Sequence, residues 1–298
     1  MAGSAISEFV VLEAALEARR LQVEAALRRL HQGGHAPGVA AAIEHSLFAP
    51  AKRLRPILSL LVADVLRSDV EQVLPPACAI EMVHTASLIL DDLPCMDDAT
   101  SRRGRPACHV VHGEATAILA AFALQNRAFA ILAEGWPGGP GAETRAAVAR
   151  DLSLAVGLEG MIAGQAQDLA GTDRIIDFPT LEFIHSRKTG ALFTAAAALG
   201  ALAARPGERA AIISYAKNLG LAFQIVDDLI DVGGAEAEAG KDVGKDLKKT
   251  TFVSFSGVEG ARDLARELIG AAQEALAGFG PRAQPLRDLA RYVVTRGR

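Results

Sequence analysis

Residues 52–65, KRLRPILSLLVADV, show the pattern that decides the fold. Leu58, Leu61, Val62 and Val65 recur at intervals of three and four residues, which places them on one face of an α-helix. Similar spacing runs through most of the chain, where Ala and Leu dominate. No segment alternates apolar and polar residues convincingly, and Asn-Gly and Asp-Gly hairpin turns are absent. The sequence therefore predicts an all-α fold.

Gly and Pro punctuate this helical pattern only sparsely, for example at residues 33–37, 136–141 and 171–179. None of these breaks resembles a disordered linker, so we expect one domain of about ten helices spanning residues 1–298. The polar, glycine-rich residues 233–249 are long for a structureless connection, and such loops often act as lids.

The bulk composition excludes some classes of protein. The chain has 298 residues, half of them hydrophobic, and a net charge of −4, which argues against a general nucleic-acid binder. Cys78, Cys95 and Cys108 form no CxxC pair, as expected for free thiols in a cytoplasmic protein. The N-terminus lacks a signal-peptide pattern, and the apolar runs Ala115–Leu124 and Ala195–Ala204 are too short to cross a bilayer. We therefore expect no membrane span.

Two aspartate clusters are candidates for chemistry: DDLPCMDD at residues 91–98 and DDLID at residues 227–231. Each follows an apolar run, and like charges packed there are costly unless a cation neutralises them. Asp227 and Asp231 share one helix face, whereas Asp97 must reach back past the break at Pro94. One Asp-Asp pair alone is more typical of a solvated helix end. Two such clusters favour Mg²⁺, which prefers carboxylates together with substrate phosphates.

Several basic runs accompany the aspartates: residues 52–55, residues 101–105, residues 187–188, and lysines at 241, 245, 248 and 249. Arginine suits bidentate phosphate contacts, and lysine acts as a point charge. Each run alone is most often a solvated face. Together they suggest two anion sites, one bridged by metal and one held directly by cations, as two diphosphate substrates would require.

At this point the motifs resemble those of the trans-isoprenyl diphosphate synthases, from about residue 47 to the end. The stretch from His84 to Asp98, followed by RRGRP at 102–106, resembles the first aspartate-rich motif of that family in its longer bacterial form. FQIVDDLID at 223–231 resembles the second. KRLRP at 52–56, GQAQD at 164–168, KTG at 188–190 and GKDVGKD at 240–246 follow in the expected order.

The resemblance implies a single-domain isoprenoid synthase bundle of helices around a deep central cavity, usually in a homodimer. It implies condensation of isopentenyl diphosphate with dimethylallyl, geranyl or farnesyl diphosphate. About three Mg²⁺ ions, bridged by substrate diphosphate, would serve as cofactor. Proton loss to the departing diphosphate would make a dedicated base unnecessary. A closing loop at residues 233–249 would exclude water.

The resemblance also assigns roles to single residues. The implied metal ligands are Asp91, Asp92, Asp97 and Asp227, with Asp231 near the metal through water or a second shell. The allylic diphosphate would be held by Arg102, Lys188, Lys241 and Lys249. Isopentenyl diphosphate would be held by Lys52, Arg55, His84 and Arg103. The catalytic set is Asp91, Asp92, Arg102, Lys188, Thr189, Gln224, Asp227 and Lys241, of which Thr189 and Gln224 line the reacting centre.

Product length depends on the depth of the apolar pocket beneath the first aspartates. Ala86 and Ser87, one turn back along the same helix, are small, whereas a bulky aromatic there stops the chain at farnesyl in this family. We therefore expect geranylgeranyl diphosphate. Farnesyl diphosphate is the alternative if Phe122, Phe129 or another helix forms a floor.

Two departures from the family pattern remain: Pro50-Ala51 stands where Gly-Gly is usual, and Ala121-Phe122 stands where Gly-Asp is usual. Three other functions compete. A non-catalytic partner subunit typically loses aspartates that this chain keeps. A terpene cyclase would not need the cations of a second diphosphate site. A di-metal helical oxidase, which binds its metals through Glu-x-x-His pairs, is the weakest of the three alternatives.

Overall fold

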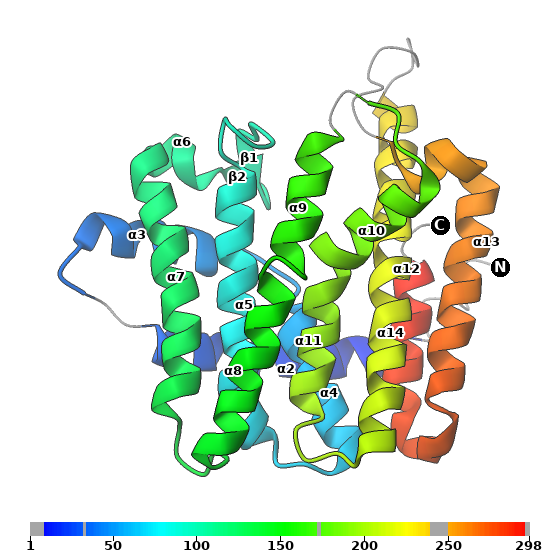
Figure 1. The fold of residues 1–298 in the computed structure, drawn as a ribbon, viewed down its shortest axis with the longest axis horizontal. Helices are drawn as coiled ribbons and strands as arrows, with labels where there is room; N and C mark the ends of the chain where they lie inside the picture. The colour runs from blue at the N-terminus through cyan, green and yellow to red at the C-terminus, as the bar shows by residue number, and fades with distance from the viewer. Residues whose placement is uncertain (1–8, 32–33, 172–173, 239–249, 296–298) are drawn as a thin grey trace. The chain divides into compact units, whose positions relative to one another are not determined.

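The computed structural model describes residues 9–31, 34–171, 174–238 and 250–295. These residues are almost entirely helical (Figure 1), which confirms the predicted all-α fold. A two-residue antiparallel ladder is the exception within them: β1 (Ser101–Arg102) pairs with β2 (Arg105–Pro106). The predicted lid falls largely on residues 239–249, which lie outside the described residues.

The chain divides into two compact units, one formed by residues 14–151 and the other by residues 1–13 and 152–298. The prediction of one domain over residues 1–298 stays a prediction. The unit of residues 14–151 holds most of α2 (Val10–Leu30) and of α8 (Ala142–Val156). Between them lie α3 (Pro37–Leu47), α4 (Leu54–Leu66), α5 (Val70–Asp91), α6 (Cys108–His112) and α7 (Glu114–Glu134).

In this unit α5 packs against α4 and α7 (Figure 1). The predicted apolar face of α4 is in the core, where Leu58, Leu61, Val62 and Val65 are all buried. Burying side chains of this size stabilises the fold by about 1.5–3 kcal/mol each. Asp69 begins α5, since its side chain accepts a hydrogen bond from the Glu71 N–H. The core thereby fixes the C-terminal end of α5, where the first aspartates lie.

The other unit contains α9 (Met161–Ala170), α10 (Phe178–Lys188), α11 (Gly190–Gly200), α12 (Pro206–Glu238), α13 (Phe252–Ala275), the 3-10 helix η1 (Ala277–Ala283) and α14 (Gln284–Thr295). Helix α12 packs against α11 and α13. The buried Tyr215 of α12 donates a 2.7 Å hydrogen bond to the Leu286 carbonyl of α14. A capping box of Thr251 and Ser254 begins α13. These contacts hold the α12 segment that carries the second aspartate cluster.

Two described helices, α5 and α7, are long and apolar enough to cross a membrane. The run Ala115–Leu124 was too short by itself, but it forms only part of the 21-residue α7. Core helices pass the same test, and 72% of the α5 window and 39% of the α7 window are buried inside the protein. The absence of a membrane span therefore stays a prediction.

Candidate active site

The first aspartate cluster folds back on itself at the end of α5. The Asp97 N–H donates to the Asp91 carbonyl at 2.9 Å, and the Ala99 N–H donates to the Asp92 carbonyl at 3.2 Å. The backbone therefore returns past Pro94 and brings Asp97 beside Asp91, as the sequence required.

The two adjacent aspartates have different surroundings. Asp91 is half-buried, whereas Asp92 is only 2% exposed. The Asp92 carboxylate accepts hydrogen bonds from Nε of Arg102, at 2.9 Å, and from its Nη2. This hydrogen bond is the main cause that raises the pKa of Arg102. The predicted metal ligand Asp92 and the predicted diphosphate contact Arg102 therefore bind each other here, and both roles stay predictions.

A tight hairpin carries Arg102 and Arg103. Its turn residues Arg103 and Gly104 have φ values of 54° and 73°, the left-handed conformation that suits a two-residue hairpin. Glycine adopts this conformation readily, whereas Arg103 does so at a cost. The hairpin thus places two consecutive arginines close to the end of α5.

Two of the predicted isopentenyl diphosphate contacts, Arg55 on α4 and His84 on α5, lie against each other. Nη1 of Arg55 lies 3.1 Å from Nε2 of His84. Burial lowers the pKa of His84 well below its usual value, and the charges of Arg55 and Arg103 lower it further. His84 is therefore neutral. Since a guanidinium only donates, Nε2 of His84 accepts and its Nδ1 carries the proton. The Lys52 side chain is exposed at the start of the same segment.

The second aspartate cluster lies on α12. Asp227 is half-buried and Asp231 is exposed, but Asp228 is buried. The Asp228 carboxylate accepts hydrogen bonds from Nε2 of Gln224, at 3.1 Å, and from the Phe252 N–H at the start of α13, at 3.2 Å. Burial raises the pKa of Asp228.

Thr189 and Gln224 were predicted to line the reacting centre, and the structure brings them together. The Thr189 hydroxyl donates to Oε1 of Gln224 at 3.0 Å, while the amide of Gln224 binds Asp228. Sequence analysis did not assign Asp228 a role. Its spacing of four residues from Gln224, one helical turn, was the only signal.

Lys188 is the last residue of α10. Its Nζ donates to Asp168 at 2.7 Å, and both side chains are mostly buried. Asp168 therefore orients Lys188. Lys241 and Lys249 lie outside the described residues, so the structure does not place these two predicted contacts.

The acidic residues suit Mg²⁺ that takes only one or two of its ligands from the protein at each position. Among the described residues, no group of three or more His, Cys, Asp or Glu side chains is arranged to hold a metal ion. Mg²⁺ commonly binds through one or two carboxylates together with substrate phosphates. Asp91 with Asp97, and Asp227 with Asp231 one helical turn later, offer such pairs. The donor set fits Mg²⁺ that binds together with diphosphate.

The predicted product-length residues differ in burial. Ala86 is 2% exposed in the core, whereas Ser87 is half-buried and its hydroxyl donates to the His84 carbonyl at 2.9 Å. Phe122 is 64% exposed on α7, which speaks against it as a floor within its own chain.

The family model described as polyprenyl synthetase matches residues 37–276. A dimethylallyltranstransferase of Fischerella ambigua (strain UTEX 1903) is 42% identical over 94% of this chain and 82% of its own. A geranylgeranyl diphosphate synthase of Cyanophora paradoxa is 41% identical over 93% of this chain and 94% of its own. The crystal structure of an FPP/GFPP synthase from Zymomonas mobilis superposes with a TM-score of 0.86 at 35% identity, covering 96% of this chain and 99% of that one. The chain therefore belongs to the polyprenyl synthetase family, the trans-isoprenyl diphosphate synthases.

Proposed function

We propose that this prenyltransferase condenses isopentenyl diphosphate with allylic diphosphates and releases geranylgeranyl diphosphate. The observation that carries the proposal is the Arg55–His84 pair, which lies within electrostatic reach of Arg103 and contains no carboxylate. One diphosphate needs metal and carboxylates, whereas the second needs only cations. A terpene cyclase, which ionises one diphosphate, has no use for the second set.

Bound Mg²⁺ would offset the negative charge that builds up on the leaving diphosphate. Asp91, Asp97 and Asp227 are the proposed ligands, with Asp231 nearby. Asp92, the other predicted ligand, also sets the orientation of Arg102. Arg102 and Lys188 would bind the same allylic diphosphate, since Asp168 holds the Lys188 ammonium in place.

Thr189 and Gln224 contribute through the direction of their hydrogen bond. Because the Thr189 hydroxyl donates to Gln224, its oxygen lone pairs are what it offers to a neighbouring group. An oxygen lone pair that points towards a carbocation stabilises it electrostatically. In the proposed reaction the allylic carbon–oxygen bond breaks, and the isopentenyl double bond attacks the cation. The proton then lost passes to the departing diphosphate.

The product assay tests the proposed function directly. Purified protein receives Mg²⁺, isopentenyl diphosphate and, in separate reactions, dimethylallyl, geranyl or farnesyl diphosphate. We expect a geranylgeranyl product from all three primers and no product once EDTA removes the metal. A stop at farnesyl would establish the alternative that the FPP/GFPP synthase similarity favours. Absence of condensation by folded protein would favour the cyclase or the partner subunit.

Product length has a separate test at Ser87. A phenylalanine at the buried Ala86 would overpack the core at a cost of about 1–3 kcal/mol. A change in product could then reflect a destabilised protein and not the depth of the pocket. Ser87 is half-buried and tolerates a larger side chain better. We expect Ser87→Phe to shift the product towards farnesyl diphosphate while condensation with geranyl diphosphate continues, and Ser87→Ala to leave the product unchanged. An unaltered geranylgeranyl product from Ser87→Phe would remove this helix from the pocket wall.

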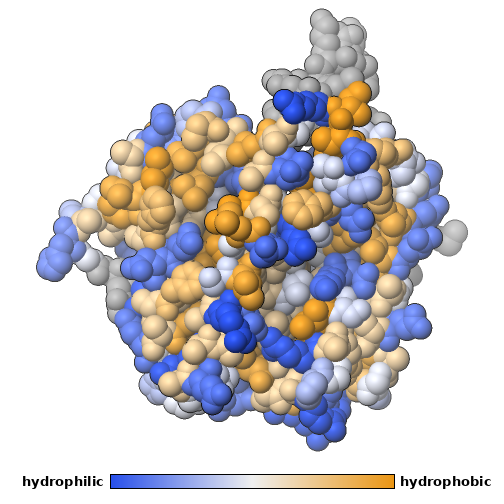
Figure 2. All heavy atoms as spheres, in the orientation of Figure 1, coloured by the Kyte–Doolittle hydropathy of each residue, from blue (hydrophilic) through white to orange (hydrophobic). Residues whose placement is uncertain are grey.

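The proposal includes a homodimer. Five large apolar side chains are at least 36% exposed on α6 and the first half of α7: Val110, Val111, Ile118, Leu119 and Phe122. Figure 2 shows hydrophobic side chains gathered over this part of the unit of residues 14–151, the α6–α7 face. A second copy of this chain is the proposed partner. The free cysteines Cys78, Cys95 and Cys108 support a cytoplasmic location.

A further inference from the structure

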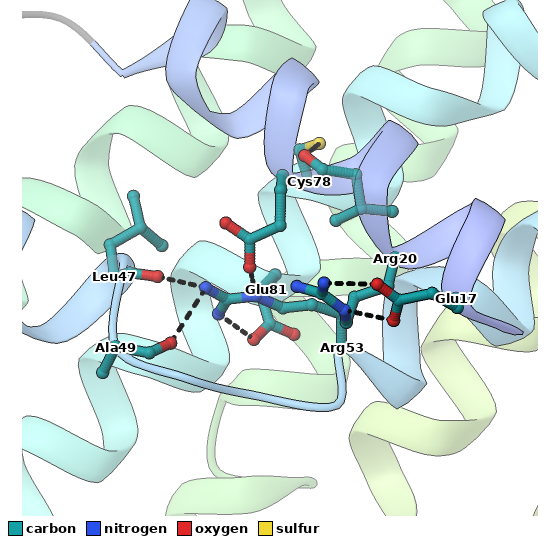
Figure 3. A network of polar contacts seen from close by, with 9 residues as sticks. Glu17, Arg20, Leu47, Ala49, Arg53, Cys78 and Glu81 are labelled. Carbon is teal, nitrogen blue, oxygen red and sulfur yellow. Dashed lines mark hydrogen bonds and ion pairs between the residues drawn. The ribbon is translucent and has the colours of Figure 1, made fainter. Parts of the chain in front are cut away.

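Arg53 lies between two proposed substrate contacts, Lys52 and Arg55, but its own side chain is fully buried. Two nitrogens of its guanidinium bind carboxylates from two different helices. Nε donates to Glu24 at 2.7 Å and Nη1 donates to Glu81 at 2.7 Å. Figure 3 shows this side chain enclosed among its partners. A buried arginine cannot bind substrate directly.

The remaining donor, Nη2, binds main-chain carbonyls. It donates to the Leu47 carbonyl and, at 3.4 Å, to the Ala49 carbonyl (Figure 3). These carbonyls belong to the end of α3 and to the connection that follows it, where no further helical turn supplies a donor. Arg53 therefore fixes the main chain just before Lys52.

The backbone of Arg53 fixes the chain on the other side. Arg53 is the N-cap of α4, with φ 50° and ψ 36°, and its carbonyl accepts from the Ile57 N–H at 3.1 Å. Left-handed backbone is costly for a residue with a side chain and persists only where its surroundings hold it. Neither Pro50 nor Ala51 has a positive φ, so this connection does not need glycine there. The left-handed residue is Arg53, whose side chain determines the turn.

The two carboxylates tie this turn to other elements. Glu24 comes from α2, and Glu81 comes from α5, one turn before His84. Together they carry one more negative charge than Arg53 neutralises. The charge of Glu81 also favours the protonated form of Arg103, whose pKa burial lowers. The buried group therefore supports the cations around it in both position and charge.

We infer that Arg53, locked by Glu24 and Glu81, is a positioning residue that holds Lys52 and Arg55 in place for isopentenyl diphosphate. The inference rests on the proposed function of this site. It predicts that disturbing Arg53 affects isopentenyl diphosphate and leaves the allylic substrate unaffected.

The test compares two Arg→Lys variants. Arg53→Lys keeps the charge but loses the planar fork. The matched control is Arg127→Lys, because Arg127 is also mostly buried in the same unit and binds one carbonyl, of Leu30, and one carboxylate, of Glu134. We expect Arg53→Lys to raise the KM for isopentenyl diphosphate about tenfold, while the KM for farnesyl diphosphate changes less than about twofold. Arg127→Lys is expected to lower Tm without changing either KM.

A second variant separates an effect on the KM from loss of folding. Arg53→Met combined with Glu24→Leu and Glu81→Leu replaces the buried charges by apolar side chains, a change that often preserves stability. The carbonyls of Leu47 and Ala49 still lose their donor, so we expect a folded protein with a raised KM for isopentenyl diphosphate. An unchanged KM in both variants, or equal rises for both substrates, overturns the inference. Wild-type turnover, measured alongside, tests the proposed function separately.

Discussion

His185 on α10 is the side chain whose surroundings give the clearest pH dependence. Its ring lies 5.0 Å from the Phe252 ring, and its buried Nε2 has no hydrogen-bond partner among the residues that the structure describes. Burial lowers the pKa of His185 to about 4, although Asp168 nearby favours the charged form. The imidazole is therefore neutral in the folded protein at neutral pH.

This burial predicts acid sensitivity. The unfolded chain binds a proton at His185 near pH 6.5, whereas the folded chain does so only near pH 4. The contribution of neutral His185 to the free energy of unfolding is fully present above pH 6.5 and is lost as the pH falls towards 4. Because one pKa unit corresponds to 1.36 kcal/mol, the loss is at most about 3 kcal/mol. In urea unfolding, the free energy of unfolding of the wild type should decrease between pH 7.5 and 4.5 by about this amount more than that of His185→Phe. The exposed His35→Gln should behave like the wild type.

The same comparison controls for two other buried titratable groups. The raised pKa of Asp228 makes the folded state gain stability as the pH falls, and the lowered pKa of His84 acts in the same direction as His185. Both are common to wild type and variant, so the difference isolates His185. Equal pH slopes for the two proteins would contradict the burial argument.

At the scale of residues, sequence reasoning found the side chains with visible chemistry but missed two that position them, Asp228 and Arg53. Thr189 with Gln224 and Arg55 with His84 were expected and do meet. Asp228 looked equivalent to Asp227 because only the start of α13 shows which of them points inward. Arg53 likewise resembled its basic neighbours, since its partners Glu24 and Glu81 are 29 and 28 residues away.

At the scale of elements, the approach of α9 to α10 depends on Gly164. A Cβ built there would lie 2.2 Å from the Lys188 nitrogen and 2.8 Å from its Cα. Both are backbone atoms that cannot move without shifting α10. The glycine of the GQAQD motif therefore permits the close packing that places Asp168 against Lys188.

Gly164→Ala is accordingly predicted to separate the two helices. Overpacking of this kind costs about 1–3 kcal/mol, and displacement of Lys188 should raise the KM for the allylic diphosphate. The control is Gly270→Ala in α13, where an added Cβ meets no atom of the described residues within 4 Å. That change should stabilise the protein by about 0.5–1 kcal/mol with unchanged kinetics. Urea unfolding and steady-state kinetics check both, and a stable, fully active Gly164→Ala would show that α10 can shift freely.

Helical periodicity predicted the elements well, with one omission. The hairpin at residues 101–106 has strands of only two residues, too short for any alternation to show. Its turn, Arg103-Gly104, is not among the dipeptides that mark hairpins in sequence. A strand pattern needs several residues to appear, so sequence alone described this segment only as basic.

At the scale of the molecule, Phe122 is the departure that matters most. The family usually carries aspartate at this position, whereas this chain presents a phenylalanine that is 64% exposed. With Leu119, 56% exposed, it forms the centre of the α6–α7 face. Exposed apolar patches of this kind commonly mark protein interfaces.

A second copy of the chain covering this face predicts a specific effect of charge. We expect the wild type to sediment at twice the mass of one chain, and Phe122→Glu to sediment as a single chain because a buried, unpaired carboxylate is costly at an interface. The control is Ile175→Glu, since Ile175 is 98% exposed in the other unit and lies outside the proposed interface.

The other outcomes are equally informative. If Phe122→Glu stays dimeric, the interface does not include the α6–α7 face. If the wild type stays monomeric at micromolar concentration, this face binds a different protein. If Phe122→Glu is monomeric and still condenses isopentenyl diphosphate, each chain holds a complete site. If it is monomeric, folded and inactive, the dimer is part of the catalytic architecture.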